Sequence, residues 1–346
     1  MRFIHLLLLT TLLTASCSER GTLQFAPADD VGTIRNIWTV NFRSDIQATS
    51  QGTPPRPEQV RYQKLDVSIP PTHQPGQIEW PKGEPDTRTD FVTVGQADFE
   101  TPASFTRAVA RSDVSRQNET LVFVHGYNTR HAEAVYQMAQ IAEDFAFPMP
   151  VVLFSWPSAG VTAGYVYDRD SVLVSRDLLE QTIMDLSRDP NRKVVLMAHS
   201  MGSQLVMETL RQIELKGSLD IANSIGGVVL MAPDIDGEVF RTQAQSISKL
   251  PQPFILMVAK QDRALRISSL LTGRRPRLGA QTDRSAVGNL PISVIDVSDL
   301  TTEKNFEHKI TTTSPAAISI LRRLSEETPP GEANIGELVV LSELPN

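Results

Sequence analysis

From residue 120 onward, short apolar runs alternate with segments in which apolar residues recur at helical spacing. The runs typical of buried strands are TLVFVHG (120–126), VVLFSWPS (151–158), KVVLMA (193–198), IGGVVLMAP (225–233), PFILMVAK (253–260) and PISVIDV (291–297). The clearest helical positions are Val135, Met138, Ala142 and Phe145, then Val172, Leu179, Ile183 and Leu186. This alternation predicts an α/β fold with a mostly parallel central sheet and helices on both faces.

Two further strands are expected before this region, at 34–43 and 60–70, because both segments alternate between apolar and polar residues. A proline-rich stretch at 70–88 predicts a long loop. After Leu324 the chain has five glutamates and no basic residue. We therefore expect one domain over 34–325, with its core at about 118–325 and an acidic extension at 326–346.

The first residues have the pattern of an export signal. Arg2 precedes an apolar stretch, Phe3 to Leu13, which is too short to cross a bilayer core of about 30 Å. The end of the segment, LTASC, resembles a bacterial lipobox. The resemblance implies cleavage after residue 16, a lipidated tether over 17–33 that begins at Cys17, and attachment to the envelope membrane, with Ser18 pointing to the outer membrane. The alternative is an ordinary signal peptide with a chance cysteine.

The charge and the motifs of the chain argue against nucleic acid, a metal ion and a phosphate-bearing cofactor as partners. The chain has 346 residues and a net charge of −7, so no global basic field attracts nucleic acid. No histidine and carboxylate spacing typical of a metal hydrolase is present, and no glycine-rich phosphate loop. We expect neither a metal nor a cofactor.

The strand at 193–198 runs directly into AHSMG, and a helical pattern begins at Met201. A serine at such a junction sits on a tight turn that projects its hydroxyl above the carboxyl ends of the strands. Ala198 stands where the usual G-x-S-x-G pattern has glycine. Ser200 is the candidate nucleophile, and the alternative is a serine that only caps the helix.

A serine nucleophile needs a base and an acid that orients it. His308 is the only histidine after Ser200, and it lies between the last predicted strand and a final helix. Asp262 follows the strand at 253–260 and is the candidate acid. Asp234 and Asp236, which end the preceding strand, are its rivals. Their alternative role is to form a turn and cap the next helix.

The oxyanion hole is expected after the first core strand, where Gly126 permits a sharp turn. We predict the main-chain N–H groups of Tyr127 and Met201 as its donors, since Met201 also opens a helix N-terminus. His125 and His199 are interpreted as structural.

The chain resembles the α/β-hydrolases, and within them a bacterial esterase/lipase-like branch of uncharacterised function. The motifs that carry the resemblance are FVHGYNT, FSWPSAG, AHSMG, APDIDGEVF and the terminal His308, over about residues 34–325. The resemblance implies an α/β-hydrolase fold and carbonyl-ester hydrolysis by a serine triad. It names no substrate.

The expected activity is hydrolysis of a small-molecule or lipid carboxylic ester through an acyl-enzyme. A thioesterase or amidase on the same triad is a near alternative, and a catalytically silent envelope lipoprotein is a second. Six arginines follow the candidate acid: Arg263, Arg266, Arg274, Arg275, Arg277 and Arg284. They fit either an anionic substrate or membrane surface, or a solvated loop.

Overall fold

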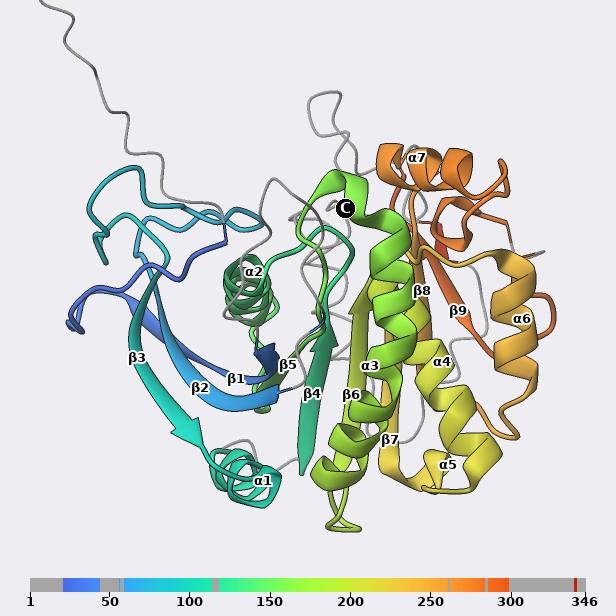
Figure 1. Ribbon diagram of the computed structural model, residues 1–346, viewed down its shortest axis with the longest axis horizontal. Helices are drawn as coiled ribbons and strands as arrows, with labels where there is room; N and C mark the ends of the chain where they lie inside the picture. Colours follow the sequence, from blue (N-terminus) through green and yellow to red (C-terminus); the bar gives the residue numbers. More distant parts are fainter. Residues whose placement is uncertain are drawn as a thin grey trace, which may run out of the picture.

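The computed structural model describes residues 21–43, 56, 59–113, 118–260, 262–283 and 286–298, together with the main chain of 339–340. Within these residues a ten-stranded sheet has the order β10-β9-β8-β7-β6-β4-β5-β1-β2-β3 (Figure 1). Its strands are β1 (Thr33–Arg43), β2 (Gln59–Ile69), β3 (Val92–Phe99), β4 (Glu119–Val124), β5 (Val151–Ser155), β6 (Lys193–His199), β7 (Ile225–Met231), β8 (Phe254–Val258), β9 (Ser293–Asp296) and β10 (Val339–Val340).

The helices alternate with the core strands along the chain. They are α1 (Pro102–Arg111), α2 (His131–Asp144), α3 (Tyr165–Leu186), α4 (Met201–Lys216), α5 (Ile221–Ser224), α6 (Gly237–Gln245) and α7 (Arg263–Leu271), with short 3₁₀ turns at Thr162–Gly164 and Leu278–Ala280. β4 to β9 run parallel, β1 joins β5 in parallel, and β2 and β3 extend the sheet as antiparallel strands. The predicted fold class, an α/β-hydrolase fold with extra N-terminal strands, is confirmed.

The sheet separates two apolar cores because successive strand residues face opposite sides. Val122 and Val124 of β4 pack in one core with residues of α1, α3, α4 and α6. Leu121 and Phe123 of the same strand pack in the other core with residues of α2. Burial on both faces explains why these strands read as continuous apolar runs in the sequence.

The strand order places β4 between β5 and β6, so the chain leaves β4 towards one side and later returns on the other. Ligands of open α/β sheets bind where this reversal opens a crevice at the carboxyl ends of the strands. His125 to Tyr127 follow β4, and Ser200 follows β6, at this point of the sheet. The fold therefore brings the predicted oxyanion segment and the predicted nucleophile to one place.

Candidate active site

Ser200 occupies the junction of β6 and α4 with a main-chain conformation of φ 52° and ψ −121°. A residue with a Cβ atom rarely adopts this region, and a strained conformation of this kind costs about 1–3 kcal/mol. The turn is held by the Ser200 N–H, which donates to the carbonyl oxygen of Met231 in β7 at 2.9 Å. The Ser200 side chain makes no capping hydrogen bond to α4, so helix capping does not account for the serine.

Two glycines allow the segments after β4 and β6 to touch. A Cβ atom at Gly202 would lie 2.4 Å from the carbonyl oxygens of both Val124 and His125. A Cβ atom at Gly126 would lie 3.1 Å from the Cβ of Ser200. Any larger residue at 202 would push α4 away from β4, because main-chain atoms cannot move aside as a flexible side chain can.

The two predicted oxyanion donors lie on either side of this contact. Met201 is the first residue of α4, and the N–H groups of a helix's first turn have no acceptor within the helix. Tyr127 directly follows Gly126, and its hydroxyl donates to the carbonyl oxygen of Thr162 at 2.6 Å. The Tyr127 ring also packs edge-on against Tyr165, with ring centroids 5.4 Å apart.

Asp168, in the first turn of α3, ties the segment after β4 to the segment after β5. Its buried carboxylate accepts hydrogen bonds from the N–H of Asn128 at 3.1 Å, from the N–H of Ala159 at 2.6 Å and from the hydroxyl of Ser158 at 2.6 Å. Burial raises the pKa of Asp168, although these hydrogen bonds act in the opposite direction. One carboxylate therefore fixes the main chain next to the predicted donor Tyr127.

Two histidines pack next to this segment, His125 fully buried and His131 partly buried. His125 stacks on Trp156, its Nδ1 donates to the Gly126 carbonyl oxygen at 2.8 Å, and the Trp156 indole donates to the His125 carbonyl oxygen at 2.8 Å. His131 lies 3.0 Å from the Ser155 hydroxyl through its Nδ1. Burial lowers the pKa of each histidine to about 4, so both are neutral at pH 7. This environment fits the structural role expected for His125.

Asp262 follows β8 and is the N-cap of α7, where its Oδ1 accepts a hydrogen bond from the Leu265 N–H at 3.0 Å. The carboxylate is buried. Its place at the carboxyl end of a core strand agrees with the sequence expectation. His308, the expected base, and Cys17, the expected lipidation site, lie outside the described residues.

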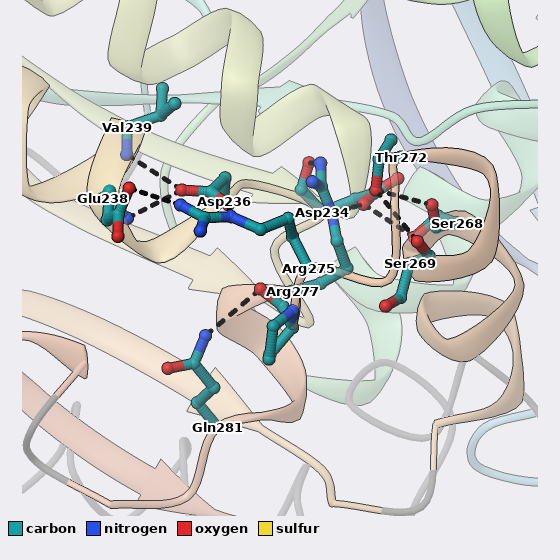
Figure 2. A network of polar contacts seen from close by, with 11 residues as sticks. Asp234, Asp236, Glu238, Val239, Ser268, Ser269, Thr272, Arg275, Arg277 and Gln281 are labelled. Carbon is teal, nitrogen blue, oxygen red and sulfur yellow. Dashed lines mark hydrogen bonds and ion pairs between the residues drawn. The ribbon is translucent and has the colours of Figure 1, made fainter.

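The rival acid Asp234 is occupied by other contacts. Figure 2 shows Arg277 and Ser268 converging on its carboxylate. Asp234 Oδ1 accepts from Arg277 Nε at 2.5 Å and from the Ser268 hydroxyl at 2.8 Å, and Oδ2 accepts from the Tyr165 hydroxyl at 3.0 Å. Asp234 and Arg277 are both buried, with Arg277 only 4% exposed. Asp234 is thus one half of a buried ion pair that joins α3, α7 and the segment after β7.

Asp236 is the N-cap of α6, which is the alternative role that the sequence indicated for it. Its Oδ1 accepts hydrogen bonds from the N–H groups of Glu238 and Val239 at the start of α6. Arg275 pairs with Asp236 at 3.1 Å and also with Glu238 (Figure 2). Among the arginines after the candidate acid whose side chains the structure describes, Arg275 and Arg277 have carboxylate partners, while Arg266 and Arg274 are exposed.

Sequence reasoning did not find the roles of Asp168 and Arg277. For Asp168 a signal exists, because it lies on the same helical stripe as the buried residues Tyr165 and Val172, where a carboxylate needs partners. Arg277 lies 43 residues from Asp234 in a segment without periodicity. Among the described residues, no group of three His, Cys, Asp or Glu side chains could hold a metal ion.

Comparison with known proteins gives one family. The family model described as "Alpha/beta hydrolase of unknown function (DUF900)" matches residues 101–324, well over half of the chain. No curated protein matches the sequence.

Solved structures with a similar fold include three hydrolases. A Xanthomonas campestris protein of the α/β superfamily is 16% identical over 60% of this chain and 99% of its own, with a TM-score of 0.33. Phospholipase PlaB from Legionella pneumophila is 14% identical over 62% of this chain and 60% of its own, with a TM-score of 0.38. Lipase B from Aspergillus fumigatus is 13% identical over 71% of this chain and 64% of its own, with a TM-score of 0.36.

Proposed function

The chain belongs to the family of α/β hydrolases whose model matches residues 101–324, and from the geometry at Ser200 we propose that it is a serine hydrolase of carboxylic esters. The observation that carries the proposal is the strained main chain of Ser200, at the carboxyl end of β6 and beside Gly126. A serine held in this way, with no capping role, is the arrangement expected of a nucleophile on a strand–turn–helix junction.

The proposed reaction has two halves. The Ser200 hydroxyl attacks the ester carbonyl carbon while His308 accepts its proton, and the N–H groups of Tyr127 and Met201 stabilise the oxyanion. His308 then returns the proton to the leaving alcohol, which leaves an acyl-enzyme. Water then attacks the acyl-enzyme carbonyl carbon while His308 accepts its proton. His308 returns the proton to the Ser200 oxygen as the carbon–oxygen bond to Ser200 breaks, and the carboxylic acid leaves. Asp262 orients the imidazole and stabilises its positive charge.

Two observations favour Asp262 over Asp234 as the acid in this scheme. Asp234 already compensates the buried guanidinium of Arg277, and both of its oxygens accept hydrogen bonds from other side chains. Asp262 follows β8 at the carboxyl end of the sheet, and its Oδ1 accepts the N–H of Leu265 in the cap of α7.

The deciding experiment is labelling of the full-length chain with a fluorophosphonate probe, alongside hydrolysis of a short-chain p-nitrophenyl ester. Ser200→Ala should abolish labelling and lower kcat by about 10⁴-fold or more. Ser203→Ala is the matched control, since Ser203 is a buried serine in the first turn of the same helix. It should label and hydrolyse like the natural chain.

A natural chain that neither labels nor hydrolyses esters or thioesters, yet melts cooperatively, would assign the fold to a silent binding scaffold. Labelling without ester turnover, but with turnover of a thioester or amide, would keep the triad and change the substrate class. Labelling that survives Ser200→Ala would reject the nucleophile itself.

We also propose that Cys17 carries a lipid anchor that holds the domain at the outer membrane. The support is the LTASC sequence and the position of the only cysteine in the chain. In the described part of the chain, no helix is long and apolar enough to cross a bilayer.

A further inference from the structure

Helix α7 turns three large apolar side chains to the outside. Ile267 is 58% exposed, Leu270 is 64% exposed and Leu271 is 61% exposed. Their spacing of three and four residues places them on one side of the helix. Single exposed apolar residues are ordinary on a protein surface, but three that adjoin on one helix form a continuous patch. We call Ile267, Leu270 and Leu271, with the flanking Arg266 and Arg274, the outer face of α7.

The opposite side of α7 is held firmly by the body of the protein. Leu265 is buried, and the Ser268 hydroxyl donates to the Asp234 carboxylate at 2.8 Å (Figure 2). Asp262 caps the first turn, and the Thr272 hydroxyl donates to the Ser268 carbonyl oxygen at 2.8 Å in the last. The helix therefore has a fixed rotation about its axis, and the exposure of the outer face is a consequence of that rotation.

The outer face is also locally basic in an acidic protein. From Asp262 to Asp283 the chain has five arginines, and its only acidic residues are these two at the ends. Arg275 and Arg277 are occupied by ion pairs, whereas the exposed Arg266 and Arg274 have no carboxylate partner among the described residues. Arg266 and Arg274 therefore place two positive charges beside the apolar residues of the outer face.

We propose that the outer face of α7 docks on the surface of an anionic phospholipid bilayer. Ile267, Leu270 and Leu271 enter the boundary between headgroups and acyl chains, and Arg266 and Arg274 contact lipid phosphates. A basic amphipathic helix with a compact apolar face has the composition that binds such surfaces. A stable protein partner needs about 800 Å² from each side, more than three side chains supply.

Docking in this way has a consequence for the rest of the molecule. Helix α7 starts at Asp262, after the carboxyl end of β8, on the edge of the sheet that also carries Ser200 (Figure 1). A bilayer bound to α7 therefore lies at the same end of the strands as Ser200. The docking proposal does not depend on that site being catalytic, because it rests only on the shape and charge of α7.

The test places an environment-sensitive fluorophore on the outer face of the full-length chain. Cys17 is the only cysteine, so Leu270→Cys in a Cys17→Ser background creates a single labelling position. The label at 270 should shift to the blue and brighten with vesicles that contain equal parts of phosphatidylglycerol and phosphatidylcholine. Little change is expected with phosphatidylcholine alone, and added salt should reverse the shift.

The matched control is Leu215→Cys in the same background. Leu215 is 63% exposed, like Leu270, but it lies at the far end of α4, roughly 20 Å along the helix from Ser200. Its label should not respond to vesicles. The proposal is overturned if the label at 270 is silent with anionic vesicles, or responds equally to neutral ones. It is also overturned if the label at 215 responds as strongly.

A second measurement tests the arginines. Replacing both Arg266 and Arg274 by Gln should raise the lipid concentration for half-maximal response about 25-fold, since each arginine near an anionic surface contributes roughly 5-fold. Arg188→Gln removes one positive charge elsewhere and is the control, because Arg188 lies between α3 and β6, at the amino end of that strand. It should leave the midpoint unchanged. An unchanged midpoint in the double variant would reject charge recognition. A shift that depends on protein concentration without vesicles would assign the face to a second copy of the chain instead.

Discussion

The main-chain N–H of Asp234 donates a hydrogen bond to the carbonyl oxygen of Ser200, at 3.2 Å. The segment after β7 is thus fastened directly to the turn that presents the candidate nucleophile. Through its side chain, Asp234 also holds Ser268 of α7, the helix that Asp262 caps. Asp234 therefore contacts both the turn at Ser200 and the helix that Asp262 caps. A substitution of Asp234 should act mainly on stability, and a substitution of Asp262 mainly on activity.

Asp262→Asn should keep the fold and lower kcat by about 10³–10⁴-fold, because the imidazole of His308 then loses the partner that fixes its tautomer. Asparagine caps a helix about as well as aspartate, so the melting temperature should change little. The measurement is kcat with one activated ester beside a thermal melt.

Asp234→Asn should act mainly on stability. It leaves the buried guanidinium of Arg277 without a compensating charge, which costs about 3 kcal/mol or more. This exceeds the loss of about 1 kcal/mol expected from a residue that only caps or braces a turn. If Asp234→Asn instead removes activity with an unchanged melt, while Asp262→Asn remains active, the acid must be reassigned to Asp234.

Asp168→Asn should impair the proposed oxyanion hole. The amide that replaces one carboxylate oxygen cannot accept from both Asn128 and Ala159, so the segment that carries the Tyr127 N–H loses a fixed position. We expect kcat to fall about 10²-fold, as for loss of one oxyanion donor, with a smaller change in KM.

A transition-state analogue separates this effect from general destabilisation. Its affinity for Asp168→Asn should weaken roughly in step with kcat/KM, measured at a temperature where the variant is folded. Asp170→Asn, an exposed change on the same helix, should leave both quantities unaltered. Equal kinetics for the two variants would contradict a positioning role for Asp168.

A feature of this protein could be predicted from the sequence when the residues that form it lie close together along the chain. Strands β4 to β9 were predictable because each buries both faces and so appears as an apolar run. The edge strand β3 was not, because the second half of VTVGQADF faces solvent and needs no apolar residue. The strand–turn–helix junction at Ser200 was predictable from local sequence, whereas the Asp234–Arg277 pair joins residues 43 positions apart and leaves no local pattern.

His73 gives the protein a pH-dependent contact. Its ring lies between Glu79, at 2.9 Å, and Asp144 of α2, at 3.1 Å, and so ties the proline-rich loop to the helix. Burial lowers the pKa of His73, but the hydrogen bonds and charges of Asp144 and Glu79 outweigh it and raise the pKa above 6.5.

A group whose pKa is raised by folding stabilises the folded state below its unfolded pKa. That contribution is lost as pH rises through the folded pKa. The natural chain should therefore melt above His73→Gln by the largest margin below about pH 6.5, and the margin should shrink as pH rises. Thermal melts of both proteins across this range make the comparison, and a margin constant with pH would contradict it.

Cys17→Ser should abolish fatty-acid labelling of the protein in cells and release it from the membrane fraction, or leave its signal segment uncleaved. Each buried CH₂ of an acyl chain contributes about 0.8 kcal/mol, so two long chains anchor a protein firmly. Metabolic labelling with a fatty-acid analogue, followed by fractionation, measures both effects. A natural chain that takes up no label would remove the anchor from the proposal.

The main chain of Ser200 also affects what chance substitution can do to this protein. Glycine adopts φ 52° and ψ −121° without the clash of a Cβ atom, so Ser200→Gly should relieve part of a strain of about 1–3 kcal/mol. Most random substitutions destabilise a folded chain, whereas this one combines a gain in stability with the loss of a hydroxyl. In a lineage that does not need the hydroxyl, Ser200→Gly would stabilise the fold and carry no functional cost. A serine at position 200 is therefore not expected to persist through stability alone.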